Sequence, residues 1–175
     1  SGFDGIRAVN ATTVKVTGGT IANNGQHGLC SAGESEVTGG KLSANRYNLV
    51  NSGVMKVSGL KLESSGSNSI VNEKGGRLTV TNVEVRNAGY HGIANFSGST
   101  ATLNNIRVFG TSGKGVHNQG GTLNGTNITV MSTNGAGVGN EKDKDGTTGT
   151  LTIDRLETTG CTSSNVVNVC AGTTT

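Results

Sequence analysis

Two histidines of this sequence stand in a setting that suits acid or base chemistry. His27 and His91 each precede a glycine and an aliphatic residue, in "QHGL" and "YHGI". The same position recurs along the chain, however, and a catalytic residue is not expected to repeat in register. We therefore predict exposed turn residues that fill a position of the repeat. The alternative is a polar and aromatic stripe that contacts a glycan by stacking and hydrogen bonding. The residues predicted to bind this ligand are His27, Tyr47, His91 and Lys114.

The carboxylates are too scattered to form a hydrolase site. Glycoside hydrolysis needs two grouped carboxylates, and lyase-type elimination needs acidic calcium ligands beside a base. The aspartates are spread over the chain, and Glu63 and Glu84 lie near Lys61, where charge pairing is the simpler explanation. The spacing of Cys, His and Asp residues indicates no nucleophilic triad. The sequence therefore predicts a protein that is not an enzyme and has no catalytic residues.

A charged insertion at residues 140–149, "NEKDKDGTTG", is the strongest local irregularity. Glu141, Asp143 and Asp145, followed by Gly146, resemble the first half of an oxygen-rich calcium loop. Two lysines intervene, and no bidentate acid follows at the expected distance. A solvated surface loop is the favoured interpretation, and Ca²⁺ at these three residues is the alternative. No other cofactor is expected.

The elements that position these residues follow from an internal repeat. A four-residue pattern recurs along the chain: a small residue, an aliphatic residue, any residue and then Asn. It is found in "NLVN", "SIVN", "GIAN", "GVHN" and "GVGN", and "GLCS" at Ser31 is a weaker first copy. Successive anchors lie 20, 21, 23, 23 and 22 residues apart. Stacked side-chain amides at one turn would form a ladder of hydrogen bonds. The predicted ladder consists of Asn51, Asn72, Asn95, Asn118 and Asn140.

Aliphatic residues keep nearly the same period. One column holds Ile21, Leu42, Leu62, Val85, Val108 and Val130; a second runs from Val16 through Val37, Val57, Val80 and Leu103 and continues near Leu123 and Ile153. Three short β-prone runs per repeat describe one coil of a parallel β-helix, in which each coil buries its apolar face against its neighbours. The sequence predicts an all-β parallel β-helix of about seven coils of about 22 residues. Residues 1–175 are expected to form one solenoid segment.

With these columns, the chain resembles the right-handed parallel β-helix superfamily of pectate lyases, polygalacturonases, phage tailspikes and autotransporter passenger domains. The alternations "VKVTGGTIANNGQHGL" and "LNGTNITVMSTNGAGV" are most similar to pertactin-type passengers. The resemblance covers nearly the whole chain and implies a fold more specifically than an activity. It also implies an adhesin or, more distantly, a polysaccharide-cleaving protein. The three cysteines depart from such passengers, which usually contain little cysteine.

The two ends depart from the repeat. The opening "DGIRAVN" resembles the second half of a coil, so we expect the segment to be part of a longer chain or its ends to be covered by neighbouring subunits. Residues 161–175 are expected to form an irregular last coil. A disulfide between Cys161 and Cys170 would pin this coil in an oxidising compartment.

The charge and hydropathy of the chain limit the kinds of partner that it is expected to bind. The formal net charge is +3, without a Lys/Arg run that would follow phosphates, so nucleic acid is not expected. No apolar stretch is long enough to span a bilayer. A mildly basic outward column is expected to contain Lys41, Lys61, Glu84, Arg107 and Arg155. The favoured role of this column is to keep the surface soluble, and the alternative is contact with an acidic polysaccharide.

The function predicted from these features is that of a surface-exposed stalk, adhesin or assembly segment of a larger extracellular or cell-surface protein. Its partner would be a glycan or a protein of a host or neighbouring surface. The alternatives are a polysaccharide-binding or polysaccharide-cleaving β-helix, and a fibre subunit that associates with itself through its coil ends.

Overall fold

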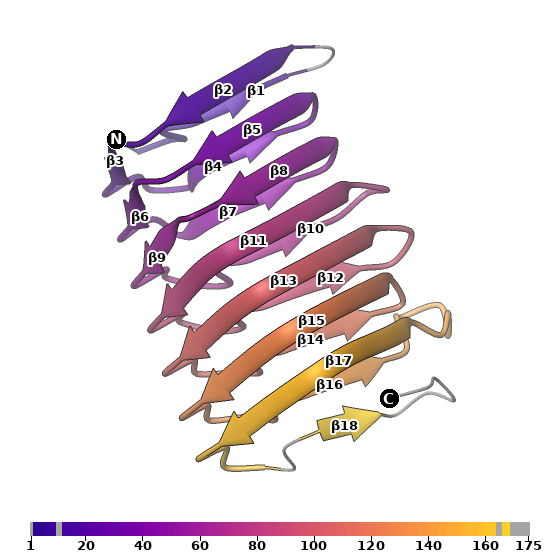
Figure 1. The fold of residues 1–175 in the computed structure, drawn as a ribbon. Coiled ribbons are helices and arrows are strands. Elements are labelled where there is room, and N and C mark those ends of the chain that lie inside the picture. Colours follow the sequence, from indigo (N-terminus) through magenta and orange to yellow (C-terminus); the bar gives the residue numbers. More distant parts are fainter. Residues whose placement is uncertain (1, 10–11, 164–165, 169–175) are drawn as a thin grey trace.

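The protein is an all-β parallel β-solenoid of about six turns, with coils stacked about 22 residues apart (Figure 1). The computed structural model describes residues 2–9, 12–163 and the backbone of 166–168. The described residues form no helix, and therefore none that could cross a membrane. The predicted all-β parallel β-solenoid and its repeat of about 22 residues are confirmed, with about six turns where about seven coils were predicted.

One face of the solenoid is an eight-stranded parallel sheet, sheet A. Each strand pairs with its equivalent in the next coil. Its strands are β1 (Ile6–Ala8), β4 (His27–Ser31), β7 (Tyr47–Asn51), β10 (Ile70–Asn72), β12 (Ile93–Phe96), β14 (Val116–Gln119), β16 (Val138–Glu141) and β18 (Val166–Asn168).

The other strands form a ten-stranded sheet, sheet B, which bends in every coil. In the first three coils a glycine-containing turn divides each run into β2 (Thr13–Thr17) and β3 (Thr20–Ala22), β5 (Glu34–Thr38) and β6 (Lys41–Ser43), or β8 (Val54–Ser58) and β9 (Lys61–Glu63). Later coils have the continuous strands β11 (Arg77–Arg86), β13 (Thr100–Phe109), β15 (Thr122–Met131) and β17 (Thr150–Thr159).

The bend of sheet B lies at a column of residues with positive φ. Gly59 (64°) is followed in this column by Asn82 (54°), Asn105 (54°), Asn127 (63°) and Arg155 (61°). Asn adopts this left-handed conformation at lower cost than most residues. The prediction that Arg155 belongs to the basic outward column is therefore wrong: Arg155 sits at the bend, and Glu157 takes the outward position.

Apolar side chains of the three β runs fill the interior. The column from Ile21 to Val130 pairs in register throughout, as the periodicity predicts. In the second column the residue that follows Leu103 is Gly125, not Leu123 as predicted. Leu123 belongs to a neighbouring column, where it pairs with Ala101. Side-chain atoms of Ile128 and Ile153 lie 3.2 Å from where a Cβ on Gly125 would be. Neighbouring isoleucines thus occupy the space that the missing side chain leaves.

The turn from sheet A to sheet B carries a continuous chain of asparagine hydrogen bonds. Asn51, Asn72, Asn95 and Asn118 each donate from Nδ2 to Oδ1 of the next asparagine at 2.8 Å, ending at Asn140. All five side chains are fully buried. The first four also donate to carbonyl oxygens of sheet B, 3.0–3.1 Å away, on Arg77, Thr100, Thr122 and Thr150. This ladder ties each turn to the following coil.

Candidate functional site

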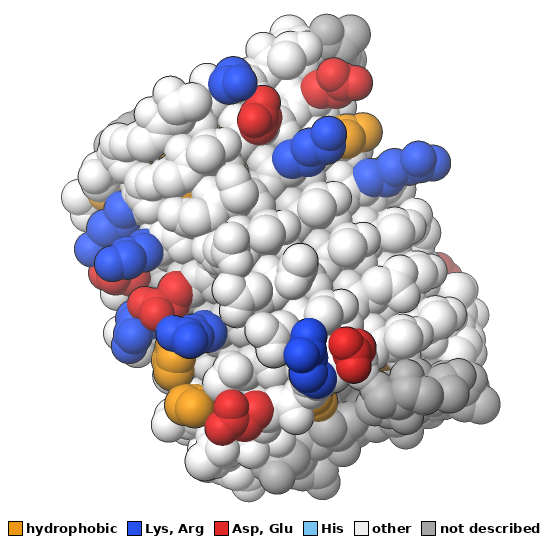
Figure 2. Space-filling model, in the orientation of Figure 1, with side chains coloured by type: hydrophobic (Ala, Val, Ile, Leu, Met, Phe, Trp, Pro, Cys, Tyr) orange, Lys and Arg blue, Asp and Glu red, His pale blue; other side chains and the backbone are white. Residues whose placement is uncertain are grey.

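The two outer faces differ in chemistry. The C-terminal half of the sheet B face carries columns of short polar side chains, with Thr100, Thr122 and Thr150 in one of them. Figure 2 shows this face, where charged side chains lie mainly toward the margins. Short hydroxyl side chains offer no aromatic platform, and the hollows on sheet B, such as the one lined by Lys61, Glu84 and Arg107, have no aromatic ring in their walls. The outer face of sheet A combines a hollow with aromatic side chains.

A shallow hollow of about 240 Å³, here named groove A, opens on the outer face of sheet A. Its floor is formed by Val50 and Val71, which pair in register on β7 and β10 and are both buried. The lining residues are His27, Tyr47, Val50, Asn68, Val71, Glu73 and Phe96. The hollow therefore combines an apolar floor with aromatic, amide and carboxylate walls.

One wall of groove A is formed by His27, Tyr47 and Asn68, which occupy the same repeat position in three successive coils. His27 pairs with Tyr47, and their rings lie 5.5 Å apart between centroids. Asn68 occupies the equivalent position in the next coil, and its Oδ1 accepts the N–H of His91 at 3.0 Å. The structure thus brings two predicted ligand-binding residues, His27 and Tyr47, together in a hollow. Sequence reasoning missed Glu73 and Phe96 because they lie just beyond the Asn column, on the opposite wall.

The other two predicted ligand-binding residues lie further along the same face, outside groove A. His91 is only 3% exposed, so the expectation of an exposed turn residue is wrong. Its ring is packed beside Tyr90 and His117, with centroids 3.9 and 4.4 Å away. Its Nδ1 accepts the backbone N–H of Lys114 at 2.9 Å. His91 therefore occupies a structural position between coils.

A charged cluster surrounds His91. Glu141 receives Lys114 Nζ at 3.0 Å on one carboxylate oxygen and His117 Nε2 at 3.1 Å on the other. Burial acts to raise the pKa of Glu141, but the hydrogen bonds and charges of Lys114 and His117 lower it below its usual value. Burial, reinforced by Lys114 and opposed by Glu141, lowers the pKa of His117. Lys114 is thus engaged in an ion pair rather than presented alone to a ligand.

Burial, with the nearby charges of His117 and Lys114, lowers the pKa of His91 to about 3. In the unfolded chain a histidine titrates near pH 6.5, so below that pH the unfolded state binds a proton that the folded state does not. The stability contributed by neutral His91 is complete above about pH 6.5 and is lost as the pH falls toward 3. Protonation of Nδ1 would also remove its hydrogen bond from Lys114 N–H.

We expect acidification from pH 7 to pH 5 to lower the free energy of unfolding by about 1–2 kcal/mol through His91. Urea unfolding at the two pH values measures this loss. The control is His91→Asn, because Asn68 already fills the equivalent position and accepts a backbone N–H in the same way. The variant should lose less stability on acidification, and an equal loss in both proteins would contradict the assignment.

The three predicted calcium ligands are not gathered into one group. Glu141 faces Lys114 and His117. Asp143 turns inward to its own loop, where its Oδ1 accepts the N–H groups of Asp145 and Thr147 at 3.0 and 2.7 Å. Asp145 pairs with Lys144 at 2.7 Å. The partners of these three carboxylates in the structure thus include Lys114, His117, Lys144 and backbone N–H groups of the loop.

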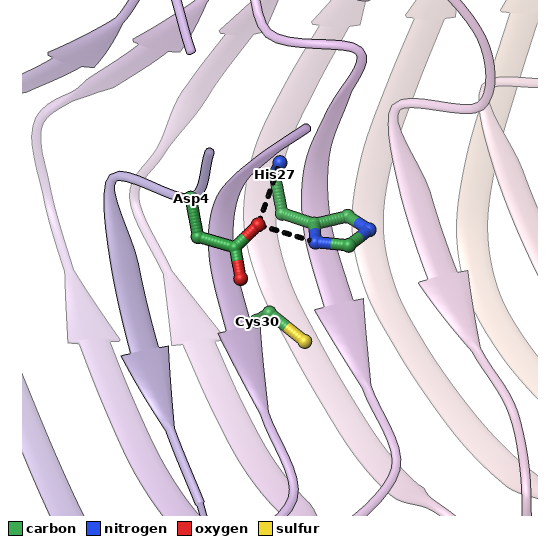
Figure 3. A group of neighbouring side chains, drawn as sticks. All are labelled: Asp4, His27 and Cys30. Atoms are coloured by element: carbon green, nitrogen blue, oxygen red, sulfur yellow. Dashed lines mark hydrogen bonds and ion pairs between the residues drawn. The ribbon is translucent and has the colours of Figure 1, made fainter. Parts of the chain in front are cut away.

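A different set of possible metal ligands meets at one end of the outer face of sheet A. Figure 3 shows Asp4, His27 and Cys30, whose ligand atoms all lie within 4.8 Å of one another. His27 Nδ1 lies 2.7 Å from Asp4 Oδ1, which also accepts the backbone N–H of His27 at 3.2 Å. Burial and the negative charge of Asp4 raise the pKa of the Cys30 thiol. Among the described residues, no other group of three or more His, Cys, Asp or Glu side chains lies close enough together to hold one metal ion.

The local chain path explains this convergence. His27 and Cys30 are three residues apart on β4, a separation that would place them on opposite faces of a regular strand. Gly28 and Leu29 are both buried between them, however, so both flanking side chains lie on the outer side. Asp4 precedes Gly5 as His27 precedes Gly28, one coil earlier. This repeated position is the sequence signal that could have identified Asp4.

The predicted disulfide cannot be placed, because Cys170 lies outside the described residues. The same applies to most of the irregular coil expected at residues 161–175. Comparisons with known protein families, with curated proteins and with solved structures found no match to this chain.

Proposed function

We propose that this chain is a non-enzymatic, adhesin-type binding module that holds a glycan across groove A. The observation that carries the proposal is the combination of a buried valine floor with ring-bearing walls from several coils. Tyr47, His27 and Phe96 supply flat surfaces for sugar rings, and Asn68 and Glu73 supply polar groups. An open hollow that crosses coils suits an extended polymer better than a small enclosed ligand.

The absence of paired carboxylates supports binding rather than cleavage. Glu73 is the one carboxylate among the described residues that line groove A. Hydrolysis by a glycosidase uses two carboxylates on opposite sides of the scissile bond. The stacked coils would serve as a rigid support that keeps the walls of groove A in register. A cell-surface location, as an adhesin or stalk, belongs to the same proposal.

The proposal predicts that Tyr47→Ala weakens glycan binding about tenfold or more, since a stacking contact contributes about 1 kcal/mol beyond the buried area. Binding is measured on an array of neutral and acidic oligosaccharides, followed by calorimetry with the strongest ligand. Tyr90→Ala is the matched control, because Tyr90 is 53% exposed and does not line groove A.

Two outcomes would overturn the proposal. One is that the wild-type protein binds no glycan of the array, or that both tyrosine variants lose affinity equally. The other is the release of new reducing ends or unsaturated products from a bound polysaccharide. In that case the module would be an enzyme.

A further inference from the structure

The carboxylate of Asp4 is unusual in being almost buried beside two other metal-binding groups. Its side chain is 8% exposed, while His27 is 24% exposed and Cys30 is partly buried. A hydrogen-bonded Asp–His pair alone would account for two of the three groups. It does not require a thiol within 4.8 Å on the same side of the strand. Val50 and Val71 fill the equivalent position in the next two coils, so the fold itself does not require cysteine there.

We propose that Asp4, His27 and Cys30 form a Zn²⁺ site. Thiolate, imidazole and carboxylate are the three ligand types that zinc takes in proteins, at about 2.3, 2.0 and 2.1 Å. Ligands of one tetrahedral ion lie about 3.5 Å apart by this geometry. The three atoms are within 4.8 Å of one another, so modest side-chain rotations bring them into range.

The surroundings orient the ligands. The backbone N–H of His27 holds Asp4 Oδ1 at 3.2 Å, and Arg7 Nη1 lies 3.4 Å from the other oxygen, Oδ2. Bonds of this kind fix ligand direction and are typical of metal sites. Arg7 also offsets the negative charge of Asp4 when the ion is absent. Three protein ligands leave a coordination position for water or another group.

The site is adjacent to groove A but does not depend on its function. His27 belongs to both, and Cys30 pairs in register with Val50 of the floor. The inference rests on the three ligands alone, so it stands even if groove A binds no glycan. Because zinc must displace the thiol proton, affinity should rise with pH.

Co²⁺ is the spectroscopic probe, since a thiolate bound to Co²⁺ gives a charge-transfer band in the near ultraviolet. The chain has three cysteines, so Cys161→Ser/Cys170→Ser is used as the parent protein, in which Cys30 is the single thiol. We expect the band to saturate at one Co²⁺ per chain and Zn²⁺ to abolish it by displacement. Zn²⁺ should also protect Cys30 from a thiol-modifying reagent.

The matched variants separate ligand loss from misfolding. Cys30→Val should fold, because valine fills this position in the next two coils, and should lose the band completely. His27→Gln and Asp4→Asn should each weaken binding at least tenfold, whereas Asp154→Asn, an exposed carboxylate, should not change it. The site is refuted if Co²⁺ gives no charge-transfer band at pH 8, or if the band survives in Cys30→Val.

Discussion

Asn95→Ala is expected to lower the free energy of unfolding by about 3 kcal/mol or more. The Asn95 side chain is fully buried in the middle of the ladder. It accepts a hydrogen bond from Asn72 and donates to Asn118 and to the carbonyl of Thr122. Alanine removes these bonds and leaves the buried Oδ1 of Asn118 without its donor, whereas Asn72 Nδ2 keeps its bonds to the carbonyls of Gly76 and Thr100. The unpaired acceptor costs about 1–3 kcal/mol, and each lost hydrogen bond costs about 0.5–1.5 kcal/mol in addition.

Equilibrium unfolding in urea measures the effect of Asn95→Ala. The control is Asn104→Ala, which makes the same change at an exposed position of β13 in the same coil. A surface substitution of this kind should change the free energy of unfolding by about 0.5 kcal/mol or less. If both variants lose the same small amount, the ladder is not a significant source of stability.

Leu103→Ala is expected to cost about 3–5 kcal/mol, near the upper end for large-to-small substitutions in a core. Leu103 is 1% exposed and lies in a column between Val80 and Gly125. Gly125 has no side chain that could move into the space, and Ile128 and Ile153 already pack against it. The cavity would therefore collapse only in part.

Leu103→Met is the matched control, because it nearly conserves volume and should cost less than about 1.5 kcal/mol. Both variants are compared by urea unfolding, with the slope of the transition checked against wild type. A loss below about 1 kcal/mol for Leu103→Ala would show that the coils slide together to close the cavity. The interior would then be more adaptable than its packing indicates.

The sequence alone determined the solenoid. In a parallel stack, the spatial neighbour of a residue lies one repeat further along the chain, so a period in the sequence is also a register in space. The pairing of Leu42, Leu62 and Val85 follows directly from their spacing. The same reasoning located the asparagines that form hydrogen bonds between coils. Columns were misassigned only where the period slipped by about two residues, at Leu123 and Arg155.

Only the tertiary structure decided which side chains share a site. Whether a residue points outward depends on how the backbone turns at each corner, and a period of about 22 residues does not contain that information. His27 lines groove A, while His91, at the same repeat position, is buried between Tyr90 and His117. The Glu141 carboxylate contacts Lys114 and His117 rather than forming a group with Asp143. Likewise, Asp4 meets His27 and Cys30 because two consecutive buried residues on β4 place both side chains on the outer face.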